Sequence, residues 1–136
     1  NPGAPPQPLG KIASGGELSR ISLAIQVVTA SSGTVPSMVF DEVDVGIGGA
    51  VAEVVGRLLR DLSSRSQVLC VTHLPQVAAQ GHQHLQVTKQ SSKKQVETRL
   101  TALQDEGKVE EIARMLGGVT ITEQTLAHAR EMLESA

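Results

Sequence analysis

The sequence has almost no aromatic residues: its 136 residues include one Phe, no Tyr and no Trp. Large aromatic side chains therefore cannot supply the buried area of a core, which has to come from Val, Leu, Ile and Ala. There is also only one cysteine, Cys70. A single cysteine excludes an internal disulfide framework and fits a reducing compartment such as the cytoplasm.

Strong charge of one sign and long apolar runs are absent as well. Twelve Lys and Arg residues are balanced by fourteen Asp and Glu residues, which gives a formal net charge of -2. The chain therefore has no overall basic field that would point to nucleic acid. No apolar run approaches the roughly 20 residues that a membrane-spanning helix needs. The length suits one domain with a modest core.

Prolines are concentrated at the beginning, where residues 1–10 read NPGAPPQPLG. Proline at this density favours extended backbone and cannot start a helix. We expect residues 1–10 to form a proline-rich lead or loop, and residues 11–136 to form the folded unit of a piece of a longer protein.

Hydrophobic spacing predicts a helix from Gly16, a second helix within residues 48–64, and two short buried strands at residues 37–40 and 67–72. A short helical turn follows the second strand. This alternation is typical of parallel strands covered by helices, so the predicted fold class is α/β. The expected apolar faces are Leu18, Ile21, Ile25 and Val28 on the first helix and Val51, Val54, Val55, Leu58, Leu59 and Leu62 on the second.

The remainder of the chain predicts a hairpin and two helices. Residues 84–89 and 95–103 alternate apolar and polar side chains around QSSKK, which indicates a hairpin with one solvated face. A helix over residues 107–116 should stop at Gly117. Thr122 or Thr120 can cap a final helix that runs to about Glu134.

Polar residues follow both predicted buried strands. Asp41 and Glu42 come directly after the first strand, and His73 follows the second. In a parallel sheet these strand ends share one edge, where ligands collect. A carboxylate there could bind Mg²⁺, and a second could orient or deprotonate a water. The alternatives are an ordinary acidic loop and a histidine with a structural role.

The stretch ASGGELSR (residues 13–20) marks the beginning of the first helix. Ser14 and Glu17 have the spacing of a capping box. Free N–H groups at a helix N-terminus bind phosphate readily, and Gly15 and Gly16 would let a phosphate or a second backbone come close. The alternative is a capped helix with no ligand.

Three stretches, taken in their order and separation, resemble the motifs of the ABC ATPase superfamily. ASGGELSR resembles its signature motif, SMVFDE (37–42) its Walker B strand, and VLCVTH (68–73) its H-loop strand. The form DEVD (41–44) is used by the SMC-like chromosome and repair ATPases. The combination of QPLGKIASGGELSR, FDEVDVGIGG and VTHLPQVAAQGHQH is similar to the RecN family of bacterial DNA repair proteins, over nearly the whole chain.

This resemblance implies half of an ABC/SMC-type P-loop ATPase head. Residues 11–136 would be its carboxyl-terminal lobe, with the signature, Walker B and H-loop motifs. The Walker A loop of the family belongs to an amino-terminal lobe beyond a long coiled coil, and this sequence has no G-x-x-x-x-G-K-[ST]. We therefore expect ATPase activity in the full-length protein but none in this chain alone.

Site roles follow from the same resemblance. Asp41 would hold Mg²⁺, Glu42 would polarise the attacking water, and His73 would contact the terminal phosphate of ATP. Ser14, Gly15 and Gly16 would bind the terminal phosphate held by the opposite head of a dimer. One departure is Gly48, which stands about where the family often has an aspartate.

The function implied is DNA double-strand-break repair and recombination, in which ATP joins two heads and hydrolysis releases them. The implied partners are the amino-terminal Walker A lobe, a second head, and DNA through the full-length protein, with no membrane, in the bacterial cytoplasm at the nucleoid. One alternative is the matching lobe of another ABC-type ATPase; a transporter would more often have Pro after the Glu of Walker B. Another is a non-catalytic interaction module, which the intact Glu42, His73 and Ser14 disfavour.

Overall fold

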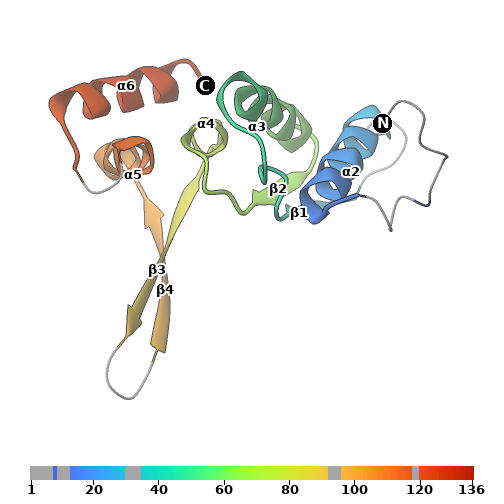
Figure 1. Ribbon diagram of the computed structural model, residues 1–136, viewed down its shortest axis with the longest axis horizontal. Helices are drawn as coiled ribbons and strands as arrows, with labels where there is room; N and C mark the ends of the chain where they lie inside the picture. Colours follow the sequence, from blue (N-terminus) through green and yellow to red (C-terminus); the bar gives the residue numbers. More distant parts are fainter. Residues whose placement is uncertain (1–7, 9–12, 30–34, 92–95, 118–119) are drawn as a thin grey trace.

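The computed structural model describes residue 8 and residues 13–29, 35–91, 96–117 and 120–136. Most of the proline-rich lead and two lysines of the hairpin turn, Lys93 and Lys94, lie outside these ranges. Along the chain the elements are α2 (Gly15–Thr29), β1 (Ser37–Phe40), α3 (Gly49–Ser63), β2 (Gln67–Cys70), α4 (Pro75–Ala78), β3 (His84–Ser91), β4 (Val96–Leu103), α5 (Asp105–Gly117) and α6 (Glu123–Glu134). Figure 1 shows α2 and α6 at opposite ends of the molecule.

Strands β1 and β2 form the parallel pair that the sequence predicts. Their register runs from Ser37 opposite Gln67 to Phe40 opposite Cys70. Strand β2 ends two residues earlier than expected. The reason is that β1 ends at Phe40, so beyond Cys70 the ladder continues only through the Val71 N–H, which donates to the Phe40 carbonyl at 2.9 Å.

The first core lies between the β1–β2 sheet and helices α2, α3 and α4. Its buried members are Leu23, Phe40, Val43, Ala52, Val55, Leu59, Leu62 and Val77. The predicted inner face of α3 is partly wrong, because Val51 and Val54 are each more than half exposed. The buried face is instead turned towards α4, and an added Cβ on Gly56 would lie 3.2 Å from the Val77 Cα.

The apolar stripe predicted on α2 does not face this core. Leu18, Ile21, Ile25 and Val28 are 39–78% exposed. Helix α2 instead packs through Leu23, which is 2% exposed. Periodicity identified an apolar face correctly, but within the described residues nothing covers it.

The second core joins α5 and α6 to the end of α4. Its buried residues are Ala79, Val109, Ile112, Ala113 and Ala129. Thr122 caps α6, as expected, and its side chain accepts a hydrogen bond from the Thr125 N–H. None of the described helices combines the length and apolar character that crossing a membrane requires.

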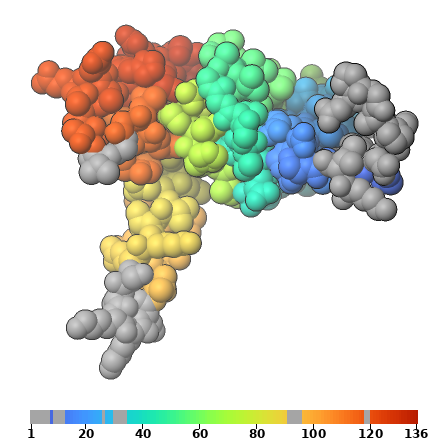
Figure 2. Space-filling model, in the orientation of Figure 1, coloured from blue at the N-terminus to red at the C-terminus, as the bar shows by residue number. Residues whose placement is uncertain are grey.

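Strands β3 and β4 form the predicted antiparallel hairpin, with His84 opposite Leu103. The expectation of only one solvated face is wrong. Val87 and Leu100, which are paired on one face, are 58% and 63% exposed. The hairpin extends away from both cores as a separate arm (Figures 1 and 2), so no described helix covers that face.

The close approach of α3 to α4 gives a test of the first core. We expect Gly56→Ala to destabilise the chain, because its new Cβ would lie 3.1 Å from the Gln76 carbonyl oxygen and 3.2 Å from the Val77 Cα. Overpacking against backbone costs about 1–3 kcal/mol, and alanine recovers only about 1 kcal/mol of helix propensity. Urea unfolding should show a net loss of about 1 kcal/mol.

The matched control is Gly107→Ala in α5. Its added Cβ would have no neighbour nearer than 3.8 Å, so stability should stay the same or rise by up to about 1 kcal/mol. A Gly56→Ala chain that unfolded at the same or a higher urea concentration than the wild type would show that α3 and α4 are not packed this closely.

Candidate functional site

The candidate residues stand where the two parallel strands end. Asp41 and Glu42 directly follow β1, and His73 follows β2 by three residues. Since β1 and β2 are neighbours in register, these side chains leave the sheet at the same edge. Asp41, Glu42 and His73 are all exposed, so this edge is accessible to a ligand.

Glu42 is turned towards the beginning of α2. Its backbone has φ of 61°, a left-handed conformation that costs a non-glycine residue about 1–3 kcal/mol. A Cβ added to Gly15 would lie only 2.6 Å from Glu42 Oε2. The absence of a side chain at Gly15 therefore lets the carboxylate of Glu42 reach the helix N-terminus of its own chain.

Helix α2 begins with the predicted capping box. The N–H and hydroxyl of Ser14 donate to Glu17 Oε2 at 2.8 and 2.9 Å, and the Glu17 N–H donates to the Ser14 hydroxyl at 3.3 Å. The hydrogen bond from the Ser14 N–H, and then that from its hydroxyl, lower the pKa of Glu17. The Ser14 groups that could bind a phosphate are thus held by a carboxylate of the same helix.

Two features attach this helix start to the loop after β1. Gly16 is buried, and an added Cβ would lie 3.1 Å from the Val45 carbonyl oxygen. Arg20 donates to the carbonyls of Val45, at 2.6 Å, and Val43, at 3.4 Å. Sequence reasoning missed Arg20, because no local spacing marks a contact between residues more than twenty positions apart.

Asp44 is the second residue that sequence reasoning missed. It is 2% exposed. Its Oδ2 accepts hydrogen bonds from the Thr72 hydroxyl and from the His73 N–H, the latter at 3.1 Å, and lies 3.4 Å from Nδ1 of His73. The only sequence signal was that Asp44 is the last residue of DEVD, after one strand, and that a Thr-His pair comes at the end of the next strand along the chain. This carboxylate joins the two strand ends.

Cys70 belongs to the core side of the sheet rather than to the site. Burial, followed by the nearby carboxylates of Asp44 and Asp41, raises the pKa of its thiol to about 12. The protonated thiol is a poor nucleophile and metal ligand. Among the described residues, no three His, Cys, Asp or Glu side chains are grouped as a protein-only metal site needs.

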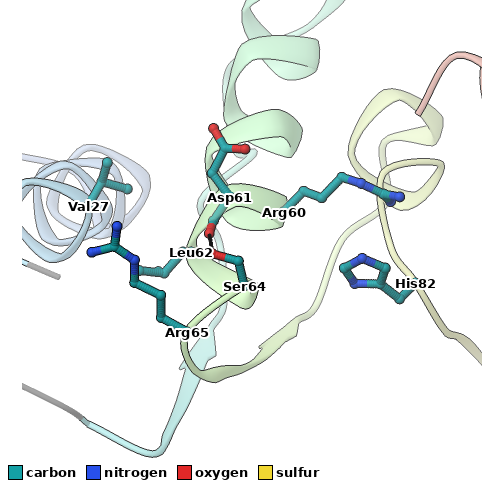
Figure 3. Close-up of a pocket in the computed structure, with 7 residues that line it drawn as sticks. All are labelled: Val27, Arg60, Asp61, Leu62, Ser64, Arg65 and His82. Carbon is teal, nitrogen blue, oxygen red and sulfur yellow. Dashed lines mark hydrogen bonds between the residues drawn. The ribbon is translucent and has the colours of Figure 1, made fainter. Parts of the chain in front are cut away.

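A surface pocket occurs elsewhere, at the end of α3. It is lined by Val27, Arg60, Asp61, Leu62, Ser64, Arg65 and His82. Ser64 and Arg65 precede β2, so the pocket is at the opposite end of the strands from His73. Arg60 and Arg65 point to different sides (Figure 3), and Arg60 donates to the Gln80 carbonyl. Its cationic groups therefore do not converge on a ligand.

Comparison with known proteins finds similar relatives of the same name in several bacteria. The chain is 59% identical over its whole length to "DNA repair protein RecN" of Vibrio cholerae and 60% identical over 98% of its length to that of Haemophilus influenzae. Identity to the RecN of Bacillus subtilis is 46% over the whole chain. This chain is RecN-like from end to end. The resemblance predicted from its three motifs is thereby confirmed.

The RecN-like chain spans about a quarter of the length of these relatives, 24% in each case. No protein-family model matches it. Among solved structures it is similar to one described as "Structural biochemistry of ATP-driven dimerization and DNA stimulated activation of SMC ATPases", with a TM-score of 0.59. That match covers 87% of this chain and 70% of the solved one at 18% identity. The predicted α/β fold class is confirmed, and the fold is similar to that of the solved SMC ATPase.

The capping box gives a test that depends on pH. Folding lowers the pKa of Glu17. The stabilisation of the fold by its carboxylate is therefore fully present above the unfolded pKa and is lost as pH falls through the folded pKa. We expect an NMR titration of the Glu17 carboxyl to show a depressed midpoint, which rises part-way towards the ordinary value in Ser14→Ala, where the Ser14 N–H remains.

The matched control is Thr122→Ala, which removes the equivalent cap from α6. It should leave the titration of Glu17 unchanged. Equal Glu17 midpoints in the wild type, Ser14→Ala and Thr122→Ala would show that the Ser14 hydroxyl does not hold this carboxylate.

Proposed function

We propose that this chain is the carboxyl-terminal lobe of an ATPase head that acts in DNA double-strand-break repair and recombination. ATP binding would join two heads and hydrolysis would release them. One observation carries the proposal: in a chain that is RecN-like from end to end, β1 and β2 are parallel neighbours that bring Asp41, Glu42 and His73 to one sheet edge. The relatives are DNA repair proteins by name, and the structural neighbour is an SMC ATPase.

The site residues suit a nucleotide that brings its own phosphate oxygens. Mg²⁺ at such sites takes one or two carboxylates together with phosphate oxygens and waters, and exposed Asp41 can supply the protein ligand. Mg²⁺ would neutralise charge on the phosphates. Glu42 would orient or deprotonate the attacking water, and His73 would contact the terminal phosphate. These roles correspond to the positions that the motifs assign.

The open face of the sheet supports an adjacent amino-terminal lobe as partner. Val39 and Leu69 are opposite one another and are 69% and 49% exposed, and Val71 on the same side is 55% exposed. Met38 and Val68, on the other face, pack on the first core. Parallel sheets are almost always covered on both faces. We infer that the lobe with the Walker A loop covers the open face.

The signature stretch would complete the site of the opposite head. Ser14, Gly15 and Gly16 are at the N-terminus of a fifteen-residue helix whose first N–H groups attract anions. Glu17 now accepts hydrogen bonds from the Ser14 N–H and hydroxyl. A terminal phosphate from the partner would replace this carboxylate on the same donors. The donors offered to the partner's phosphate would thus be the Ser14 groups that now donate to Glu17.

The test uses the full-length protein, by which we mean a RecN polypeptide that contains this chain as the segment it matches. Glu42→Gln should keep ATP binding and accumulate an ATP-bound dimer, while turnover falls by about a hundredfold or more because the amide is a far poorer base. Ser14→Arg should bind ATP but fail to form the ATP-driven dimer, because the bulky side chain blocks the helix start.

Mixing the two variants then decides whether the site is shared between heads. In a mixed dimer one composite site carries both changes, while the other joins an intact Glu42 to an intact Ser14. We expect the mixture to hydrolyse ATP faster than either variant alone. Thr122→Arg is the matched control, since it places the same side chain at the cap of α6; it should dimerise and turn over like the wild type. Normal ATP-driven dimerisation and turnover by Ser14→Arg would refute the shared site.

A further inference from the structure

We propose that Asp44 is the positioning residue for His73, holding the imidazole by its Nδ1–H so that Nε2 faces the terminal phosphate of the nucleotide. The proposal rests on the proposed function, in which His73 contacts that phosphate. It adds a residue that none of the three motifs assigns a role. The juxtaposition that carries it is a buried carboxylate on the loop after β1 against the Thr72–His73 pair that follows β2.

The burial of Asp44 shows that its contacts are specific. Asp44 is 2% exposed, and a buried carboxylate is costly unless donors surround it. Its Oδ2 accepts hydrogen bonds from the Thr72 hydroxyl and from the His73 N–H, the latter at 3.1 Å. Nδ1 of His73 lies 3.4 Å from the same oxygen. The Leu74 N–H donates in turn to the Thr72 hydroxyl at 3.0 Å. The backbone on both sides of His73 is therefore fixed to this carboxylate.

The exposure of His73 shows which part of the ring is free. Its side chain is 69% exposed although Asp44 is almost wholly buried. Nδ1 is on the side towards Asp44, so Nε2, across the ring, is on the accessible side. A carboxylate that accepts the Nδ1 proton fixes both the tautomer and the orientation of a histidine, as it does for metal-bound imidazoles.

The charge of Asp44 has a use that an amide could not replace. An asparagine oxygen could accept from the Thr72 hydroxyl and from the His73 N–H, and it would fill the same volume without the cost of a buried charge. A hydrogen bond from the ring Nδ1–H to a charged carboxylate is about twice as strong as one to a neutral amide oxygen, and only a carboxylate has no N–H group of its own to present to Nδ1. Asp44→Asn therefore weakens the hold on the imidazole while the packing of the loop is kept.

Kinetics of the full-length protein test the proposal. We expect Asp44→Asn to lower kcat by about 10–100-fold, the effect typical of a partner that orients a functional histidine, with KM for ATP changed by less than about threefold. Glu111→Gln is the matched control: Glu111 is also a buried carboxylate, 7% exposed and bonded to Arg114 and Gln86, but it lies on α5, outside the candidate site. Its kcat should stay close to that of the wild type.

A double-variant cycle separates positioning from a general structural effect. If Asp44 acts through His73, then Asp44→Asn should cost little further kcat in a His73→Gln background, within about twofold. An equal loss in both backgrounds would overturn the proposal. So would an unchanged kcat in Asp44→Asn when His73→Gln itself is impaired. If His73→Gln has wild-type kcat, or the full-length protein has no ATPase activity, the proposed function and this inference fail together.

A second measurement does not depend on how well Asp44→Asn folds. In wild-type full-length protein with ¹⁵N-labelled histidine rings, His73 is assigned by the signal lost in His73→Gln. We expect its Nδ1 to carry a proton. A His73 ring protonated only at Nε2 would contradict the proposed hydrogen bond from Nδ1 to Asp44 and overturn the inference, whatever the kinetics show.

Discussion

The parallel hydrogen-bonded pairing of β1 with β2 is the constraint on which the rest of the site depends. Strands in parallel register end at the same edge, so the loop with Asp41 and Glu42 and the turn with His73 leave the sheet side by side. Asp44 then joins the two strand ends by accepting from Thr72 and His73. If β2 slipped by one residue, every side chain would change face, and His73 would lose its partner.

The second constraint is the attachment of helix α2 to the loop after β1. Gly16 permits close contact with Val45, and Arg20 donates to two carbonyls of that loop. Glu42 and the Ser14–Gly16 helix start are therefore parts of one connected unit. In the proposed function, a change at the partner's nucleotide near Ser14 would have a short physical route to the Glu42 loop of the same chain.

Local patterns predicted the elements well, because their causes are local. The Ser14–Glu17 spacing predicted a capping box, and the cap of α6 is Thr122, one of the two threonines that the sequence offered. Alternation of helices with short apolar strands also specified parallel pairing. The burial of Asp44 and the left-handed backbone of Glu42 were not predictable, since both depend on loops that meet only after folding.

Periodicity was least informative about what covers each apolar face. The stripe of Leu18 and Ile25 on α2 and the paired Val39 and Leu69 on the sheet are apolar in pattern yet exposed. A sequence pattern identifies a face but not its partner, and here the partner is proposed to be the rest of the head. Helix α3 is a similar case, because it packs against α4 through the side that carries Gly56 and leaves Val51 and Val54 exposed.

The most direct test of a shared nucleotide site is a structure of the full-length protein with Mg²⁺ and a non-hydrolysable ATP analogue. We expect two heads, with the terminal phosphate of each analogue held between Asp41, Glu42 and His73 of one head and the Ser14–Gly16 helix start of the other. Glu17 should have released Ser14 at both sites. A bound analogue whose terminal phosphate contacts neither His73 nor the opposite Ser14–Gly16 would contradict this arrangement.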